Sequence, residues 1–356
     1  MNRTDALKQS ATKQGKPCNF IIFNSANLTY FTGFPGATAL LIPEQGENVL
    51  YVSTVNYEQA KAEAKGFNIE LIKRGENLME KIAHQTKNQT DAKIAIDSLS
   101  IESYRALAKA IGGEEKIETA NKIIQDLRKI KDPNEIQLIL QACKLANEGI
   151  KVAYETIKPG ASELEVAAEV EYAMRKKGSS GTAFDTIIAS GGNSAYPHGS
   201  CSNRIIQDGD LVVVDLGATV NFYRSDITRT ITAGKPTQKQ AKIYKIVKTA
   251  QDIAFEDIKP EVLAKDVDAA ARLAINQAGY GEYFVHNLGH GVGLEVHEAP
   301  FLSPESKDSL AVGNVVTVEP GIYIAGYGGV RIEDTVLVTK NGAEKLTSGP
   351  YTIEAC

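Results

Sequence analysis

Two aspartates stand eleven residues apart in a region whose other residues are typical of β-strands. Asp215 lies inside the valine-rich run 211–217, and Asp226 opens the next strand-like segment after a turn. An antiparallel hairpin would place the two carboxylates across the strands from each other. Because two close carboxylates repel and are costly to bury, a cation between them would remove the conflict. The alternative is that Asp226 is a turn residue and that Asp215 pairs with Arg224 or Arg229.

A second cluster contains three of the five histidines of the chain, His286, His290 and His297, within twelve residues. Glycines at 289, 291 and 293 let the backbone pass close to another group. A single histidine is more often a packed core residue than a ligand, but three beside glycines favour a functional site. His198 stands apart from this cluster, in a Tyr-Pro-His-Gly turn that follows a strand-like run.

A third cluster has the same pattern as the first, with two acids on strand-like segments that a turn connects. Glu319 ends an apolar strand-like run, residues 326–329 predict a turn, and Glu333 is expected to return on the next strand. The alternative is a surface hairpin in which Arg331 pairs with Glu333. That alternative does not explain why an acid follows four strand-forming residues.

The three clusters supply four carboxylates and one imidazole but no thiolate. Such an oxygen-rich set suits manganese, cobalt or zinc better than magnesium. Four negative charges balance two divalent cations, which bridging carboxylates would hold about 3.5–4 Å apart. The predicted metal ligands are Asp215, Asp226, His290, Glu319 and Glu333.

The N-terminal third of the chain alternates strand-like apolar runs with helical stretches, which is typical of an α/β domain. Strands are predicted at 19–23, 39–42, 49–52 and 93–97, and helices at 57–65, 77–85 and 101–111. No catalytic cluster occurs here. Asp132, Pro133 and Glu135 then predict the capped start of a long helix. We therefore expect domains at 1–127 and 128–356.

The C-terminal part contains a short internal repeat. The segment 155–159, Glu-Thr-Ile-Lys-Pro, and the segment 256–260, Glu-Asp-Ile-Lys-Pro, each precede an alanine-rich helix that ends near a glycine, Gly178 or Gly279. Two similar helix-then-strand halves predict a domain with a pseudo-two-fold axis and a cleft between the halves. Chance similarity is the alternative.

The bulk composition is that of an ordinary globular protein. The chain has 356 residues, 43% of them hydrophobic, and a formal charge of −5, so no basic field favours nucleic acid. It contains no apolar run long enough to span a membrane and no export signal, so a cytoplasmic location is expected. The four cysteines, at 18, 143, 201 and 356, are spaced as isolated thiols. Cys201 near His198 was a weaker candidate nucleophile.

Taken together, the three clusters resemble, over almost the whole chain, the metallopeptidase family of methionine aminopeptidases, aminopeptidase P, prolidases and creatinase. Asp215 and Asp226 match the first two metal ligands of that family, and His290 matches its histidine ligand. Glu319 matches the glutamate near the nucleophile, and Glu333 matches the bridging glutamate. The presence of all five argues against creatinase, whose branch has lost the metals. The resemblance implies a creatinase-type N-terminal domain followed by a pita-bread catalytic domain, an α/β (α+β) architecture.

Within this family the chain looks like aminopeptidase P and prolidase. The resemblance rests on Gly-Thr-Ala-Phe184-Asp, Pro-His-Gly, Glu-Pro-Gly-Ile-Tyr-Ile and the N-terminal segment 27–34. One departure is Phe301, because some prolidases carry an arginine at this position to bind the dipeptide carboxylate. Phe184 is a candidate wall for the proline ring, with an ordinary core phenylalanine as the alternative.

The resemblance implies hydrolysis of the Xaa-Pro bond at the N-terminus of peptides or dipeptides, by attack of a metal-bridging hydroxide. Glu319 would transfer the proton, His198 and His297 would hold the carbonyl and its oxyanion, and Arg331 would anchor this network. His286 would support the metal ligands without binding a metal itself. Two divalent ions, most simply Mn²⁺ with Co²⁺ or Zn²⁺ as alternatives, and a homodimer are expected. Another hydrolase or lyase on this scaffold, or a non-catalytic binding relative, are the alternatives.

Overall fold

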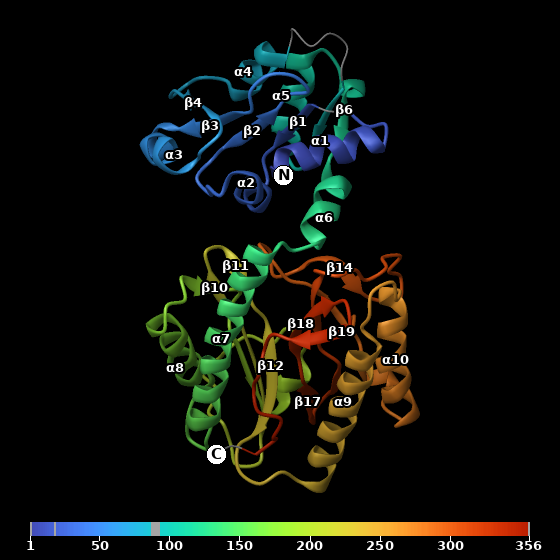
Figure 1. Cartoon of the computed structure of the whole chain (residues 1–356). Coiled ribbons are helices and arrows are strands. Elements are labelled where there is room, and N and C mark those ends of the chain that lie inside the picture. Colours follow the sequence, from blue (N-terminus) through green and yellow to red (C-terminus); the bar gives the residue numbers. More distant parts are fainter. Residues whose placement is uncertain (1, 18, 87–92, 355–356) are drawn as a thin grey trace. The chain divides into compact units, whose positions relative to one another are not determined.

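The computed structural model describes residues 2–17, 19–86 and 93–354, which fall into two compact units, Met1–Arg128 and Lys129–Cys356 (Figure 1). Cys18 and Cys356, two of the four predicted thiols, lie outside the described residues. The other two, Cys143 and Cys201, are free cysteines, as expected from their spacing.

The N-terminal unit is built on a six-stranded sheet in the order β4-β3-β2-β1-β5-β6. The pairs β1–β2 and β2–β3 are antiparallel, whereas β3–β4, β1–β5 and β5–β6 are parallel. Helices connect the strands, so the predicted α/β arrangement is confirmed. The elements are α1 (Arg3–Lys13), β1 (Asn19–Ile22), α2 (Ser25–Thr32), β2 (Ala39–Ile42), β3 (Val49–Ser53), α3 (Tyr57–Glu63), β4 (Asn68–Ile72), α4 (Leu78–Thr86), β5 (Ile94–Ile96), α5 (Ile101–Ile111), β6 (Ile117–Thr119) and α6 (Asn121–Lys129).

The predicted strands and helices of this unit are confirmed within two residues at each end. The structure adds elements that the apolar patterns did not predict, namely α1, α2, β4, β6 and α6. Helix α2 is an example: its sequence SANLTYFT is rich in residues that favour strands. Asn24 caps its start by accepting from the Asn27 N–H, and Gly33 ends it in the left-handed conformation at φ 70°.

The C-terminal unit places small antiparallel sheets between two helix pairs. In Figure 1 the helices α7 and α8 lie on one side of the strands and α9 and α10 on the other. The strand orders are β12-β9-β8, β11-β10-β7, β14-β13-β15-β18-β19 and β16-β17. The helices are α7 (Pro133–Thr156), α8 (Glu163–Lys176), α9 (Gln238–Asp257) and α10 (Ala264–Gln277). The strands are β7 (Gly181–Thr182), β8 (Ile187–Ser190), β9 (Leu211–Leu216), β10 (Ala218–Val220), β11 (Tyr223–Arg224), β12 (Ile227–Thr232), β13 (Gly289–Gly291), β14 (Glu298–Leu302), β15 (Val315–Val318), β16 (Gly321–Ile324), β17 (Gly328–Arg331), β18 (Asp334–Thr339) and β19 (Gly342–Lys345).

The helix α7 begins as the sequence predicts, and α8 begins with the same capping pattern. Asp132 and Glu135 form a capping box at the start of α7, with Pro133 in its first position. Ser162 and Glu165 form the same reciprocal pair at the start of α8. Each box satisfies backbone N–H groups that the first turn of a helix leaves without partners.

The internal repeat is present in the structure as two matching halves. The helices α8 and α10 begin at 163 and 264 and end at 176 and 277, so the halves are offset by 101 residues. The first half packs α7 and α8 against β8, β9 and β12, and the second packs α9 and α10 against strands that include β15 and β18. Each half therefore has its own apolar core, and each acidic pair lies on or directly beside a pair of antiparallel strands.

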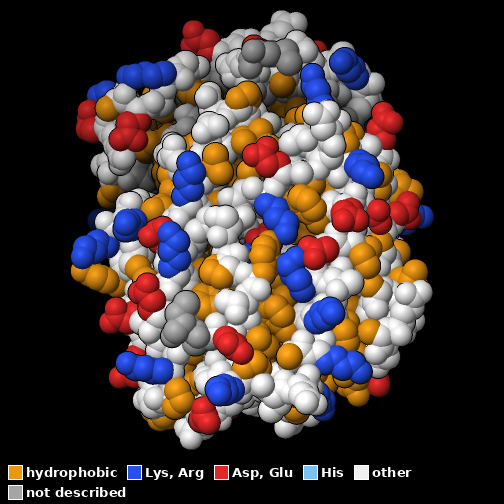
Figure 2. Space-filling model, turned by 60° about the horizontal axis from the view of Figure 1, so that its bottom comes forward, with side chains coloured by type: hydrophobic (Ala, Val, Ile, Leu, Met, Phe, Trp, Pro, Cys, Tyr) orange, Lys and Arg blue, Asp and Glu red, His pale blue; other side chains and the backbone are white. Residues whose placement is uncertain are grey.

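The surface carries charges of both signs. On the face drawn in Figure 2, lysine and arginine side chains alternate with aspartate and glutamate among apolar and polar residues. Within the described ranges, none of the helices combines the length and the apolar character needed to cross a bilayer.

Candidate metal centre

The first acidic pair lies on or directly before the paired strands β9 and β12 of the first half. Strands β9 and β12 run antiparallel with Asp215 opposite Thr228, and Asp226 lies just before β12. Asp226 is therefore the diagonal neighbour of Asp215 across the two antiparallel strands. Asp215 faces the same side of the sheet as Thr228, because the two residues are directly opposite each other. Asp226 faces that side too, because it lies two residues before Thr228.

The second acidic pair occupies the matching place in the second half. Glu319 follows β15 directly, and Glu333 lies in the link between β17 and β18 and not on a strand as predicted. Strands β15 and β18 pair with Val318 opposite Asp334, so the same register places Glu319 opposite Glu333. The two pseudo-symmetric strand pairs thus each contribute two acids.

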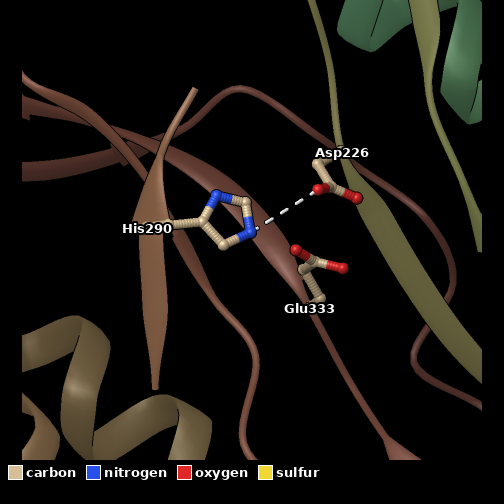
Figure 3. Close-up of side chains that lie close together, drawn as sticks. All are labelled: Asp226, His290 and Glu333. Atoms are coloured by element: carbon tan, nitrogen blue, oxygen red, sulfur yellow. Dashed lines mark ion pairs between the residues drawn. The ribbon is translucent and has the colours of Figure 1, made fainter. Parts of the chain in front are cut away.

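His290 brings an imidazole to these acids from β13. Its Nε2 lies 3.2 Å from Glu319 Oε1 and 3.8 Å from Asp226 Oδ2. Figure 3 shows His290, Asp226 and Glu333 pointing toward one another from three separate segments of the chain. One ligand atom from each of these three buried residues lies within 4.8 Å of the others, which is compatible with binding a single ion.

The glycines beside His290 allow close contact between strands. A Cβ atom on Gly289 would lie 2.1 Å from the Thr317 carbonyl oxygen, and one on Gly291 would lie 2.5 Å from the Ala299 carbonyl oxygen. The close approach expected from the glycine pattern is therefore to neighbouring backbone. It positions β13, and with it the His290 ring, between β14 and β15.

The acids are buried, but some of their carboxylate oxygens have no hydrogen-bond partner within the described part of the chain. Among the described residues, Asp215, Asp226 and Glu333 each retain one buried carboxylate oxygen that has no hydrogen bond. Burial raises the pKa of Asp226 well above its ordinary value, and the charges of Glu333 and Asp215 raise it further. Burial also raises the pKa of Glu333 well above its ordinary value, with Glu319 adding to the effect. Divalent cations would supply the missing partners and offset the repulsion, so this donor set fits a metal site.

Glu319 differs from the other acids. Burial acts to raise its pKa, but the hydrogen bond and charge of His290 outweigh burial and lower the pKa to about 2. Thr317 Oγ1 also lies 3.2 Å from Glu319 Oε1, in hydrogen-bond geometry. Glu319 is therefore ionised at neutral pH even in the absence of a cation.

Arg331 is tied to the first acidic pair by a direct ion pair. Its Nη2 donates to Asp215 Oδ2 at 2.7 Å, its Nη1 donates to Tyr323 Oη at 2.8 Å, and its Nε donates to Thr228 Oγ1 at 3.1 Å. The alternatives in which Asp215 pairs with an arginine of its own half, or Arg331 with Glu333, are both wrong. Instead, one buried guanidinium joins the two halves of the domain.

The remaining histidines surround the acids in different ways. The ring of His297 meets that of His290 edge-on, with centroids 4.2 Å apart, and burial together with the charge of His290 lowers the pKa of His297. Nε2 of His286 lies 3.0 Å from Tyr323 Oη, and burial lowers the pKa of this histidine. His198 is exposed on the loop after β8 and lines the same cleft.

All predicted site residues line one cleft of about 710 Å³ within the C-terminal unit. Phe184 and Phe301, the two candidate substrate contacts, are among its walls, and Phe301 is 41% exposed. Cys201 also lines the cleft, but its Sγ hydrogen-bonds to the Thr186 carbonyl and its pKa is raised by burial, which argues against a nucleophile.

Sequence reasoning missed the residues that orient this site. Thr228 Oγ1 donates to Glu333 Oε2 at 2.6 Å, and Tyr323 joins Arg331 to His286. Strand periodicity offered a signal for Thr228, because it lies two residues after Asp226 on the same face. Tyr323 lies diagonally across the β16–β17 pair from Arg331, which only the register reveals.

Two family models match the chain. The model described as metallopeptidase family M24 matches residues 137–340, and the creatinase/prolidase N-terminal domain model matches residues 3–130.

Individual relatives match over nearly their whole length. An Xaa-Pro dipeptidase of Pyrococcus furiosus is 45% identical over 332 residues, covering 92% of each chain. The crystal structure of the prolidase from Pyrococcus horikoshii OT3 superposes with a TM-score of 0.91 at 41% identity, covering 99% of this chain and 100% of that one. The X-Pro aminopeptidase from Thermotoga maritima superposes with a TM-score of 0.90 at 36% identity, covering 99% of both.

Proposed function

The chain belongs to metallopeptidase family M24, and from this premise we propose that it is a dinuclear metal-dependent exopeptidase that hydrolyses the Xaa-Pro peptide bond. The observation that carries the proposal is the convergence of four acids and one histidine in a single cleft. Three of the acids have a buried oxygen without a partner. Relatives named for Xaa-Pro hydrolysis support the same bond specificity.

The cation ligands in this proposal are Asp215, Asp226, His290, Glu319 and Glu333. When bound, two divalent cations would lower the pKa of a coordinated water toward neutrality and polarise the scissile carbonyl. The donor set favours manganese, with cobalt or zinc as alternatives, because hard carboxylates are combined with one imidazole. Arg331 keeps Asp215 Oδ2 occupied, which leaves Oδ1 as the oxygen available for a cation.

Glu319 is the proposed proton carrier. Its lowered pKa of about 2 keeps it ionised, so it can accept a proton from the attacking water. It then delivers that proton to the proline nitrogen as the peptide bond breaks. The leaving nitrogen of a tertiary amide needs this proton because an amide anion is a very poor leaving group.

His198 and His297 are the proposed partners of the substrate carbonyl. Both are exposed to the cleft, and the lowered pKa of His297 keeps its ring neutral near pH 7, so it can donate one N–H. A donor placed at the carbonyl oxygen stabilises the charge that develops there in the transition state. Phe184 offers an apolar wall for the proline ring.

The charges of the side chains that line the cleft affect the length of peptide that it prefers. Of the described residues that line it, Arg331 is the one lysine or arginine, and its donors are committed within the domain. Two acids besides the four proposed acidic metal ligands, Glu171 and Asp185, line the same cleft. A free dipeptide would place its carboxylate without a cationic partner here, so we infer a preference for peptides that continue beyond proline.

The remaining parts of the proposal rest on the sequence resemblance. They are a homodimer and short proline-containing peptides as substrates, and we also propose a cytoplasmic location from the hydropathy pattern of the sequence. Size-exclusion chromatography with light scattering would test the assembly.

A substrate panel with metal control tests the function. Metal-loaded protein is expected to cleave Ala-Pro-Ala and Ala-Pro, but not Ala-Ala-Ala or Met-Ala-Ala. Dialysis against a chelator is expected to abolish cleavage, and Mn²⁺ or Co²⁺ to restore it. Activity that persists after metal analysis shows less than about 0.1 ion per chain would contradict the metal role. Equal cleavage of the peptides without proline would contradict the proline specificity and favour another hydrolase of this fold.

A further inference from the structure

A buried carboxylate outside the metal centre hydrogen-bonds to both ends of the loop that carries His198. Glu163 is the first residue of α8 and is fully buried. Its Oε1 accepts from the N–H and the hydroxyl of Ser190, at 2.8 and 2.7 Å. Its Oε2 accepts from the N–H and the hydroxyl of Ser202, at 2.9 and 2.6 Å.

The two serines mark the two ends of one loop. Ser190 is the last residue of β8, and Ser202 follows His198 by four residues. One side chain therefore binds the beginning and the end of the loop 191–201 at once. An ionised carboxylate accepts hydrogen bonds only, so it suits four donors, and such charge-assisted bonds are stronger than neutral ones.

Further contacts hold the same junction together. The Glu163 N–H donates to the Arg204 carbonyl at 3.1 Å, and the Leu164 N–H donates to the Ser202 carbonyl at 3.3 Å. Arg204 Nη1 donates to Ser190 Oγ at 2.5 Å. The start of α8 is thus fastened to both ends of the loop through backbone and side-chain bonds.

The loop reaches the metal centre at its other side. The Pro197 carbonyl accepts from Arg331 Nη1 at 3.2 Å, and Ser194 Oγ accepts from the Gly329 N–H at 2.9 Å. Glu163 at the loop ends and Arg331 and Gly329 at its middle therefore together set where His198 stands.

We propose that Glu163 is a positioning residue for catalysis, which fixes the 191–201 loop and so holds His198 at the substrate carbonyl. The proposal rests on the role of His198 in the proposed function. A misplacement of about 1 Å of a catalytic group can cost roughly a hundredfold in rate, so a residue that touches no substrate can still control turnover.

The test compares Glu163→Gln with Glu165→Gln. Glutamine has the same shape, but its amide NH₂ cannot accept from the serine backbone N–H that one carboxylate oxygen binds, so at least one of the four bonds is lost. Glu165 lies on the same helix and only caps it through Ser162, a role that glutamine also fills. Hydrogen–deuterium exchange of residues 191–201 and the kinetics of Ala-Pro-Ala cleavage would be measured in the metal-loaded proteins, alone and combined with His198→Ala.

We expect loop exchange to rise about tenfold in Glu163→Gln and to stay at the wild-type rate in Glu165→Gln. We expect kcat to fall roughly 10–100-fold with KM within about twofold and with metal content unchanged. In the His198→Ala background, Glu163→Gln is expected to add less than about a threefold further loss, because both changes remove one function.

Unchanged loop exchange, or effects of the two substitutions that multiply in the double variant, would overturn the proposal. If His198→Ala alone keeps full activity, the role assigned to His198 fails, and the exchange of the loop still decides whether Glu163 fixes it. If Glu163→Gln does not fold, Ser202→Ala replaces it. That variant keeps the carboxylate and removes one hydroxyl donor, and wild-type loop exchange in it would equally overturn the proposal.

Discussion

Arg331 and Asp215 form an ion pair of 2.7 Å between the two pseudo-symmetric halves of the C-terminal unit. Asp215 lies on β9 of the first half and Arg331 on β17 of the second. The side chain of Arg331 is 3% exposed, so its charge acts on the acids with little screening by solvent. The pair orients Asp215 and reduces the net negative charge that the cations must balance.

Thr228→Val is expected to weaken cation binding. Thr228 Oγ1 donates to Glu333 Oε2 and accepts from Arg331 Nε, so valine removes both contacts while keeping the shape. Partners that orient metal ligands typically contribute 10–100-fold in metal affinity, and we expect a loss of that order. Calorimetric titration of the metal-free protein with Mn²⁺ would measure it.

Thr232→Val is the matched control for this prediction. Thr232 lies on the same strand, and its buried hydroxyl has no hydrogen-bond partner among the described residues. Valine should leave Mn²⁺ affinity unchanged and stabilise the fold slightly, because an unpaired buried hydroxyl is lost. Equal affinity losses in both variants would show that Thr228 acts through packing alone.

Asp226→Asn is expected to change how the stability of the metal-free protein depends on pH. Burial and the neighbouring acids raise the folded-state pKa of Asp226 above its ordinary value, so the folded state keeps a proton that the unfolded chain releases. The stability of the metal-free wild type therefore falls as pH rises from about 4 through the raised pKa of this group. Asparagine cannot ionise, so it removes this contribution.

Thermal unfolding in chelator between pH 5 and 8 would test this effect. The variant should have a higher Tm than the wild type at pH 8, and the difference should shrink toward pH 5. The lowered pKa of Glu319, about 2, has the opposite effect on stability, but below about pH 5, and it is common to both proteins. Added Mn²⁺ should raise the Tm of the wild type alone. If the Tm values of the two metal-free proteins change with pH in parallel, ionisation of Asp226 does not destabilise the folded state.

The proposed metal ligands could be selected from the sequence because they differ in chemical type from the residues around them. Asp215 stands in a run of valines and Glu319 follows four strand formers, so each acid needed an explanation that a cation provides. Thr228 and Tyr323 show no such difference, since threonine and tyrosine are ordinary strand residues. Their contacts depend on strand register, and a single sequence does not specify it.

The contacts of Glu163, at the start of α8, could not be predicted from the sequence either. Glu163 is one of two acids in the first turn of α8, where glutamate is common because of the helix dipole. Its function depends on Ser190 and Ser202, which lie 27 and 39 residues away in the chain. Only the packing of α8 beside the end of β8 brings them together.

Arg229→Met is expected to destabilise the domain strongly. Arg229 is fully buried and pairs with Asp334 at 3.0 Å, and it also donates to the Glu333 and Gly349 carbonyls. Breaking a buried pair leaves an uncompensated charge, which costs about 3–5 kcal/mol. Denaturant unfolding of the metal-free protein would measure the change.

Lys248→Met is the control for a pair near the surface. Lys248 pairs with Asp252, whose side chain is 50% exposed, and such pairs contribute roughly 0–1 kcal/mol. A loss below about 1 kcal/mol in Arg229→Met as well would show that the remaining partners of Asp334 suffice to hold it.

Phe301→Arg is expected to shift the enzyme toward free dipeptides. Phe301 lines the cleft at 41% exposure, in a wall that otherwise offers the substrate carboxylate no uncommitted arginine or lysine among the described residues. A charge-assisted bond to that carboxylate contributes about 1.5–3 kcal/mol, so kcat/KM for Ala-Pro relative to Ala-Pro-Ala should rise about tenfold or more. Phe301→Leu removes the ring without adding charge and should leave the ratio unchanged. An unchanged ratio in the arginine variant would show that peptide length is selected elsewhere.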